Sequence, residues 1–250
     1  MEAKRAEGFS EGTLARQAMT PAERAIEDLA RSSVRRPARL SPADLDPLVA
    51  ALGESGALEV VGMVGAFHVA NRIADLVGIE SEIPIVQRRL RRLRSFGVRL
   101  QARVLARVLD LSNRSVEIDV AAALDEIAKL RATAVPEGYR RLALAPGVAG
   151  WALSIARGLA TIDANLVARV SDRVRASLAS SDEDVEGVHP RPPDPLDALV
   201  FVGTRYPART TDALVASVRE ATGFDDARLT DLVFAIAAVN AFERVDRLLG

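Results

Sequence analysis

A helical spacing of apolar residues runs along almost the whole of this 250-residue sequence. Apolar side chains recur three and four positions apart, which places them on one face of an α-helix. Alanine, leucine, arginine and glutamate dominate the chain, whereas aromatic residues make up only 4% of it. The sequence therefore predicts an all-α fold.

Two stretches, Val60–Ala70 and Leu232–Ala241, are almost entirely apolar. Both are shorter than the roughly 18–20 residues that a helix needs to cross a bilayer. We therefore expect no transmembrane segment but buried helices, the first of them buried on most of its sides. The helices predicted from the apolar spacing and its flanking residues are Ala22–Ser32, Ala57–Val77, Asp119–Leu130, Tyr139 to about Ala179 with a break at Pro146, Leu196–Thr204, Thr210–Thr222 and Asp226–Leu249.

Arginine fills most polar positions between Arg88 and Arg107, beside an apolar stripe that runs from Val86 to Val104. A basic amphipathic helix can bind phosphates or anionic lipid, so one alternative function is an anionic-surface binder. However, Phe96 is the only aromatic residue in this run, and acidic residues elsewhere can pair with the arginines. We expect a solvated or interface face and no nucleic-acid partner.

The chain contains no cysteine. Disulfides, thiolate metal sites and thiol nucleophiles are therefore excluded together. The formal net charge of −1 produces a weak overall field, so we expect no general attraction to nucleic acid or acidic lipid. The segment Met1–Thr20 lacks the apolar core of a secretory signal, which predicts a cytoplasmic protein.

The two ends of the chain resemble each other. Pro37-Ala38-Arg39 matches Pro207-Ala208-Arg209, and the span Gly53–Gly78 is two residues shorter than Gly223–Gly250. We interpret this as a duplicated three-helix unit, which must pack against something to bury its long helix. The predicted organisation is a truncated first repeat at 1–83, arginine-rich connecting helices at 84–134, and a second repeat at 135–250 with a loop at 180–195.

The closing helix of each unit carries a recognisable pattern. Phe67-His68-Val69-Ala70-Asn71-Arg72, followed by Ala74-Asp75 and Gly78, resembles the Phe-Asn-x-x-Asn-Arg pattern of the alkylhydroperoxidase D-like and carboxymuconolactone decarboxylase superfamily, especially its peroxidase-related branch. The second copy, Val239–Arg244 followed by Asp246, matches more loosely. The resemblance implies helical repeats packed as one unit. It also implies a homo-oligomer, because that family buries its long helices between subunits.

The same resemblance implies what this chain lacks. The family keeps a Cys-x-x-Cys pair and a nearby histidine just before the matched segments, and its thiolate attacks a peroxide. We expect the first copy to begin after that motif, and in the second copy Ala176–Asp184 stands in its place. Thiol peroxidase activity is therefore predicted to be absent, and the leading hypothesis is a non-redox binding or assembly protein.

His68 and Arg72 are the candidate catalytic residues of an alternative hypothesis, a cofactor-free decarboxylase-like or lyase-like enzyme acting on a small organic acid. His68 would be the general acid or base, and Arg72 would hold a carboxylate. The favoured interpretation is structural: His68 bonds a polar neighbour in the core, and a buried Arg72 needs a carboxylate, either Asp75 or one from the other copy. The candidate substrate-binding residues from both copies are Asn71, Asp75, Asn240 and Arg244.

No metal or cofactor is predicted. Asp182, Asp184 and Glu186 resemble the first half of a calcium loop, but Pro193 stands where that loop needs a bidentate glutamate. His189 lies in a proline-rich stretch, where a surface histidine without a functional role is expected. The chain also lacks a glycine-rich phosphate loop, a dinucleotide fingerprint and a nucleophile elbow.

Overall fold

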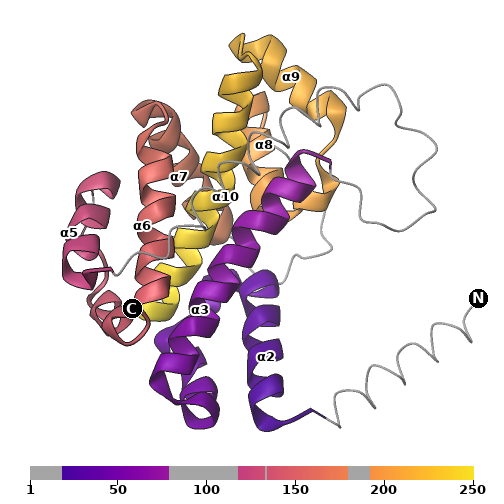
Figure 1. Ribbon diagram of the computed structural model, residues 1–250. Coiled ribbons are helices and arrows are strands. Elements are labelled where there is room, and N and C mark those ends of the chain that lie inside the picture. The colour runs from indigo at the N-terminus through magenta and orange to yellow at the C-terminus, as the bar shows by residue number, and fades with distance from the viewer. Residues whose placement is uncertain (1–18, 79–117, 133, 180–191) are drawn as a thin grey trace, which may run out of the picture.

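The computed structural model describes residues 19–78, 118–132, 134–179 and 192–250, and every regular element in these ranges is a helix (Figure 1). The prediction of an all-α fold is therefore confirmed. The arginine run at 88–107 lies outside the described residues. So does 180–191, most of the predicted loop, which contains His189 and the acidic stretch.

The first part of the fold runs from α2 (Pro21–Arg35) through η1 (Pro37–Arg39) and η2 (Pro42–Leu45) to α3 (Asp46–Leu76). A capping box starts α2: the Thr20 hydroxyl accepts from the Glu23 amide at 3.2 Å, and the Glu23 carboxylate accepts from the Thr20 amide at 2.7 Å. Gly53 has a φ of 74° and breaks α3 near its start. The helix predicted from Ala57 is the part after this break.

The middle of the chain forms α5 (Val120–Arg131), η3 (Glu137–Leu144), α6 (Pro146–Ala160) and α7 (Ala164–Ala179). Asp119 caps α5 by accepting from the Ala122 amide at 3.2 Å. Helices were predicted from Tyr139 to about Ala179: the stretch before Pro146 is a 3-10 helix, and α6 and α7 form the rest. Pro146 begins α6, which is the position where the fixed φ of proline is favourable.

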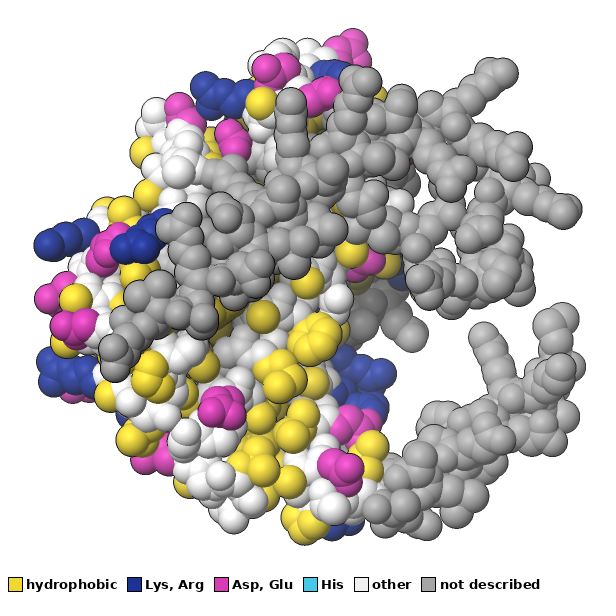
Figure 2. All heavy atoms as spheres, viewed as in Figure 1, with side chains coloured by type: hydrophobic (Ala, Val, Ile, Leu, Met, Phe, Trp, Pro, Cys, Tyr) yellow, Lys and Arg dark blue, Asp and Glu magenta, His cyan; other side chains and the backbone are white. Residues whose placement is uncertain are grey.

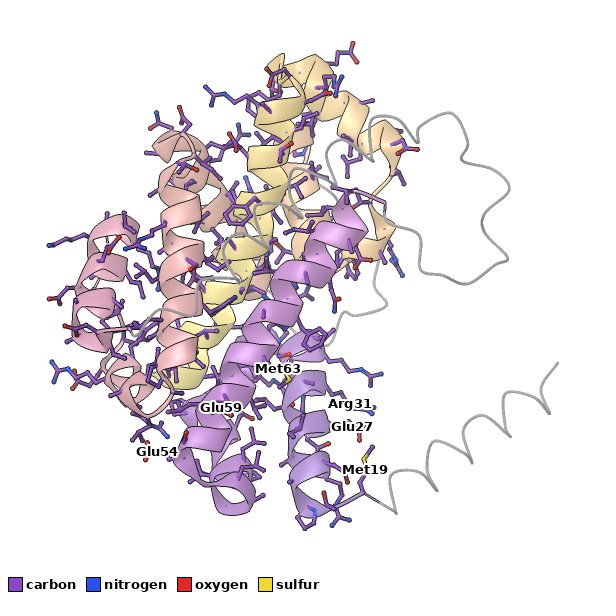
Figure 3. All side chains as sticks on the ribbon, in the orientation of Figure 1. Met19, Glu27, Arg31, Glu54, Glu59 and Met63 are labelled. Carbon is purple, nitrogen blue, oxygen red and sulfur yellow. The ribbon has the colours of Figure 1, made fainter. Side chains whose placement is uncertain are left out.

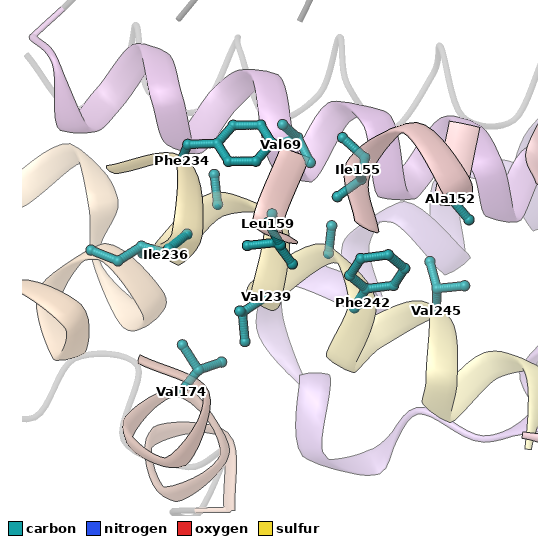
Figure 4. Close-up of a cluster of buried hydrophobic side chains, with 14 of the residues drawn as sticks. Val69, Ala152, Ile155, Leu159, Val174, Phe234, Ile236, Val239, Phe242 and Val245 are labelled. Atoms are coloured by element: carbon teal, nitrogen blue, oxygen red, sulfur yellow. The ribbon is translucent and has the colours of Figure 1, made fainter. Parts of the chain in front are cut away.

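The last part consists of α8 (Pro195–Arg205), η5 (Pro207–Arg209), α9 (Asp212–Thr222) and α10 (Asp226–Leu249). All three α-helices agree closely with their predicted ranges. From Leu229 onward α10 is buried on nearly all sides, and in Figure 1 it runs through the centre of the helices. Figure 4 shows its apolar side chains packed among residues of α3, α6 and α7: Val69, Ala152, Ile155, Leu159, Val174, Phe234, Ile236, Val239, Phe242 and Val245.

Two glycines let α3 approach α6 closely. A Cβ atom at Gly62 would lie 2.6 Å from a methyl of Val148, and one at Gly65 would lie 2.5 Å from the Trp151 ring. Both distances are shorter than carbon atoms tolerate, so the helices can pack at this separation only because these positions lack side chains. Both halves of the chain thereby contribute to one hydrophobic core.

The prediction that this helix is buried on most of its sides is wrong for the outer side of α3, where large apolar side chains are exposed. Met63 and Phe67 are 53% and 59% exposed, although they belong to the nearly all-apolar stretch. By length and composition alone, Pro42–Leu76 could cross a membrane, with a mean hydropathy of 1.5 and 44% of the apolar window buried. A core helix passes the same test, and the packing of α3 against α10 and α6 accounts for its inner face.

The backbones of the first and last parts agree beside the two Pro-Ala-Arg turns. Arg36 and Tyr206, which precede these turns, have φ/ψ of −134°/50° and −141°/54°. The glycines near the long helices do not agree: Gly53, inside α3, has φ/ψ of 74°/171°, whereas Gly223, which ends α9, is left-handed with 67°/17°. The local likeness of the two ends is therefore confined to the Pro-Ala-Arg turns.

Candidate functional site

A ring of polar side chains lies inside the fold, where α2, α3, α8 and α10 meet. None of its members is more than 7% exposed. The ring consists of Ser33 from α2, His68 and Arg72 from α3, Thr204 from α8, and Asn240 and Arg244 from α10. The structure therefore brings together four residues singled out from the sequence, taken from both ends of the chain.

His68 uses both of its ring nitrogens within the ring. The Ser33 hydroxyl donates to the Ala30 carbonyl at 2.7 Å, so it accepts from His68 Nε2, 2.9 Å away. The other nitrogen, Nδ1, accepts from Arg72 Nη1 at 2.5 Å. Burial lowers the pKa of His68 well below its ordinary value, and the charges of Arg244 and Arg72 lower it further. His68 is therefore neutral at pH 7.

Each ring arginine donates a hydrogen bond to a backbone carbonyl of a shorter helix from the opposite half of the chain. Arg72 Nη2 donates to the Thr204 carbonyl at 3.3 Å, and Arg244 Nε donates to the Ser33 carbonyl at 2.9 Å. These carbonyls belong to the last turns of α8 and α2, where helices have acceptors without an internal partner. The two guanidinium groups thus cap the ends of two helices that are far apart in the sequence.

Asn240 completes the ring between Thr204 and Arg244. Its side-chain amide donates to Thr204 Oγ1 at 3.1 Å and to the Ile236 carbonyl at 2.8 Å. Its Oδ1 accepts from Arg244 Nη1 at 3.0 Å. Asn240 is fully buried, so these bonds replace those it would make to water.

The prediction that a carboxylate pairs with Arg72 is wrong for the part of the chain that the structure describes. Arg72 forms no ion pair with Asp75, and its described hydrogen bonds go to His68 and Thr204. Burial lowers the pKa of Arg72 to about 10, and the Asp75 charge opposes that shift. Burial also lowers the pKa of Arg244, and Arg72 adds to the effect by repulsion.

Two predicted site residues lie outside the ring. Asn71 is exposed and Asp75 is half-buried on the neighbouring side of α3. Burial raises the pKa of Asp75, and the Arg72 charge partly opposes this. Conversely, Ser33 and Thr204 belong to the ring but were not predicted. Each lies a few residues before a Pro-Ala-Arg turn, where a small polar residue in an apolar helix could have signalled a capped end.

The hydrogen bonds of the ring do not run in the direction that a nucleophile activated by histidine requires. Such an arrangement needs the serine hydroxyl to donate to the histidine, and an acceptor to hold the other ring nitrogen. Here the Ser33 hydroxyl donates to a carbonyl, and Arg72 donates to His68. The bonds therefore run in the opposite direction to those of a catalytic triad.

A second buried network fixes the end of α10. The Tyr139 hydroxyl donates to Asp246 Oδ1 at 2.7 Å, and Arg131 donates to both carboxylate oxygens, with Nη1–Oδ1 at 3.0 Å. The Arg131 guanidinium also lies 4.4 Å from the ring centre of Phe242. Burial, followed by the Asp246 charge, raises the pKa of Tyr139 well above its ordinary value. The Tyr139 hydroxyl and both Asp246 carboxylate oxygens are bonded within the protein, which is typical of a network that holds helices in place.

Histidine and carboxylate side chains do not converge on a metal site: across the described ranges, no group of three or more ligand-type residues lies close enough to hold an ion. No family model matches the chain, and no similar curated protein or solved structure was found.

Proposed function

We propose that this chain is a non-redox binding or assembly protein built on an alkylhydroperoxidase D-like scaffold. The absence of cysteine removes the thiol chemistry of that family. The matching backbone angles beside the two Pro-Ala-Arg turns support the idea of a repeated unit. The resemblance of the closing helices supports the choice of family.

One observation carries the proposal. The members of the polar ring are buried and bond mainly one another and backbone carbonyls, whereas large apolar side chains are exposed on the outer side of α2 and α3. Val34 on α2 is 66% exposed, and Met63 and Phe67 on α3 are more than half exposed. Figure 2 shows hydrophobic side chains gathered over the region where these two helices lie. An exposed apolar group of this kind is typical of a surface that contacts a partner.

A second copy of the chain is the partner that this face fits. Glu59, Met63, Phe67 and Asn71 are all exposed and lie four residues apart along α3 (Figure 3 labels the first two). In an antiparallel pair of α3 helices centred on residue 65, Met63 faces the partner's Phe67, and Glu59 faces the partner's Asn71. The apolar pair then lies at the centre, and each Glu59 carboxylate meets an amide that can donate to it.

The oligomeric state tests this proposal. We expect the full chain to be a dimer or larger oligomer by analytical ultracentrifugation, and a Met63→Lys/Phe67→Lys variant to be monomeric while keeping its helical circular dichroism. Leu144→Lys is the matched control, since Leu144 is 50% exposed but belongs to η3 and not to α2 or α3. A monomeric wild type, or an equal effect of the control substitution, would contradict the proposal.

The alternative of an enzyme acting on a small organic acid gains no support from His68. General acid or base catalysis needs a nitrogen that can exchange a proton with the substrate. In the ring both nitrogens of His68 are bonded to protein groups. The alternative of an anionic-surface binder depends on Arg88–Arg107, which lies outside the described residues.

A further inference from the structure

Two positive charges are buried in the polar ring without a negative charge bonded to them. Arg72 is 6% exposed and Arg244 is 1% exposed. Within the described ranges their hydrogen bonds go only to neutral groups: the His68 ring, the Asn240 side chain and backbone carbonyls. Removing two guanidinium charges from water is unfavourable unless an anion compensates for them.

The surroundings of Arg244 add further positive charge. Its pKa is lowered by burial first and by Arg72 second, and then also by Arg247 and Arg205. Glu243 is the acidic residue that opposes this shift, but its carboxylate already forms an ion pair with an arginine of α7 at 2.7 Å. The local excess of positive charge therefore extends beyond the ring.

Loss of a proton does not relieve this excess at neutral pH. The pKa of Arg72 is lowered only to about 10, so this side chain remains charged at pH 7. His68 is already neutral and contributes no negative charge. Asp75 acts on Arg72 without bonding to it, so a bound anion is a further way to neutralise the ring.

Arg72 has a donor available for such an anion. Its Nε is buried and has no hydrogen-bond partner. The Nε edge of a guanidinium presents two parallel N–H groups, a geometry that matches two oxygens of a carboxylate or phosphate. Asp75, one turn further along α3, is only half-buried, so α3 is partly open to solvent one turn beyond Arg72.

We propose that Arg72, supported by the charge of Arg244, binds a small oxyanion of the carboxylate or phosphate type. The ion must be small, because every member of the ring is nearly inaccessible to solvent. It would satisfy Arg72 Nε and offset the repulsion between the two arginines. This site lies on the inner side of α3, so it is separate from the outer face proposed for self-association.

Thermal unfolding of the full chain with inorganic phosphate or acetate tests the proposal, with sodium chloride at matched ionic strength as the reference. Binding to the native state raises Tm in a saturable way. We expect such a rise with at least one of the two anions, and the pair distinguishes a phosphate-type from a carboxylate-type ligand. A Tm that follows ionic strength alone for both anions overturns the proposal.

Variants locate the site. Arg72→Lys keeps the charge but removes Nε, and we expect an apparent affinity at least about tenfold weaker. Arg169→Lys, which changes an arginine on α7 that is ion-paired and 44% exposed, should leave the affinity unchanged. An Arg72→Lys variant that binds the anion as tightly as the wild type overturns the proposal.

Asp75→Asn gives an independent answer, because this half-buried position tolerates substitution even if Arg72→Lys fails to fold. Removal of a negative charge close to Arg72 should strengthen anion binding by about threefold or more. Unchanged binding in this variant places the anion elsewhere and overturns the proposal. A response that appears only in Asp75→Asn has the same consequence, since Asp75 would then be the natural counter-charge.

Discussion

The two long helices, α3 and α10, are alike in sequence pattern and different in environment. Each contributes to the ring a polar residue and, four positions later, an arginine. Yet α10 is buried on nearly all sides, whereas α3 leaves Met63 and Phe67 exposed. Helices with the same local pattern can therefore lie in different places: α10 lies at the centre of the core, and α3 lies at its edge, where it can contact a partner.

The largest difference in stability should be that between substituting a phenylalanine of α10 and substituting one of α3. Phe234 is fully buried, so Phe234→Ala should cost about 3–5 kcal/mol of unfolding free energy through lost burial and the cavity left behind. Phe67 is mostly exposed, so Phe67→Ala should change the stability of the monomer by less than about 0.5 kcal/mol. Urea unfolding of both variants measures the difference.

Measuring both phenylalanine variants at several protein concentrations separates self-association from the stability of the monomer. A cost of Phe67→Ala that grows with concentration would report the contribution of this side chain to self-association. Similar losses for the two variants in dilute solution would instead show that α3 is buried as completely as α10, contrary to the exposures observed here.

Adding a single methyl group on the inner face of α3 should lower the stability of the protein. In Gly65→Ala the new Cβ would lie 2.5 Å from the Trp151 ring, so α3 and α6 must move apart, at a cost of about 1–3 kcal/mol. Gly147→Ala on α6 is the control, because a Cβ there meets nothing within 4 Å. We expect it to be neutral or slightly stabilising, by up to about 1 kcal/mol. Equal stabilities for the two variants would show that α6 does not pack on this face.

The two positive-φ glycines near the long helices should behave differently. At Gly53 and Gly223 an added Cβ meets no atom within 4 Å, so the cost of alanine is conformational at both positions. Gly223 is left-handed, with φ/ψ of 67°/17°, so alanine there should cost about 1–2 kcal/mol and asparagine should recover part of that loss. Gly53, with φ/ψ of 74°/171°, is in a region that essentially only glycine adopts, so Gly53→Ala should cost more, up to about 3 kcal/mol, and asparagine should not recover it. Chemical denaturation of the alanine and asparagine variants measures both costs, and equal costs with equal recovery would contradict this difference.

The helices could be predicted from the sequence because their signals are local. The bounds of α10 follow from the capping residue Asp225 and the terminal Gly250, and the apolar spacing between them is sufficient. The exposed side of α3 could not be predicted, since a nearly all-apolar helix does not show which face meets the rest of the protein. Only the packing of α10 and α6 on one side of it decides that.

The polar ring was predictable in part for the same reason. The spacing of His68 and Arg72 places both on one side of a helix, which the sequence alone indicates. The group that Arg72 reaches is a backbone carbonyl of Thr204, more than a hundred residues away, and backbone carbonyls carry no sequence signal. The expectation of a carboxylate partner followed from the usual pairing of buried arginines, and here helix ends supply the acceptors instead.

His68 and Asn240 precede the two ring arginines by four residues and differ in whether they can titrate. His68 is neutral in the folded protein because burial, Arg244 and Arg72 lower its pKa, whereas in the unfolded chain its pKa is about 6.5. Below that pH the unfolded state binds a proton that the folded state does not, so stability falls as the pH falls. Above pH 6.5 the full stability remains.

We expect the wild type to lose about 1 kcal/mol more than His68→Gln between pH 7.5 and 5.5, because glutamine can bond Ser33 without titrating. Urea unfolding at both pH values measures this difference, and the contributions of all other groups cancel between the two proteins. Asn240→Asp tests the other side of the ring: a carboxylate there would lie beside Arg244 and partly neutralise the buried charge. If His68→Gln keeps the pH dependence of the wild type, His68 is charged or solvated in the folded state, and the closed ring cannot be the dominant structure in solution.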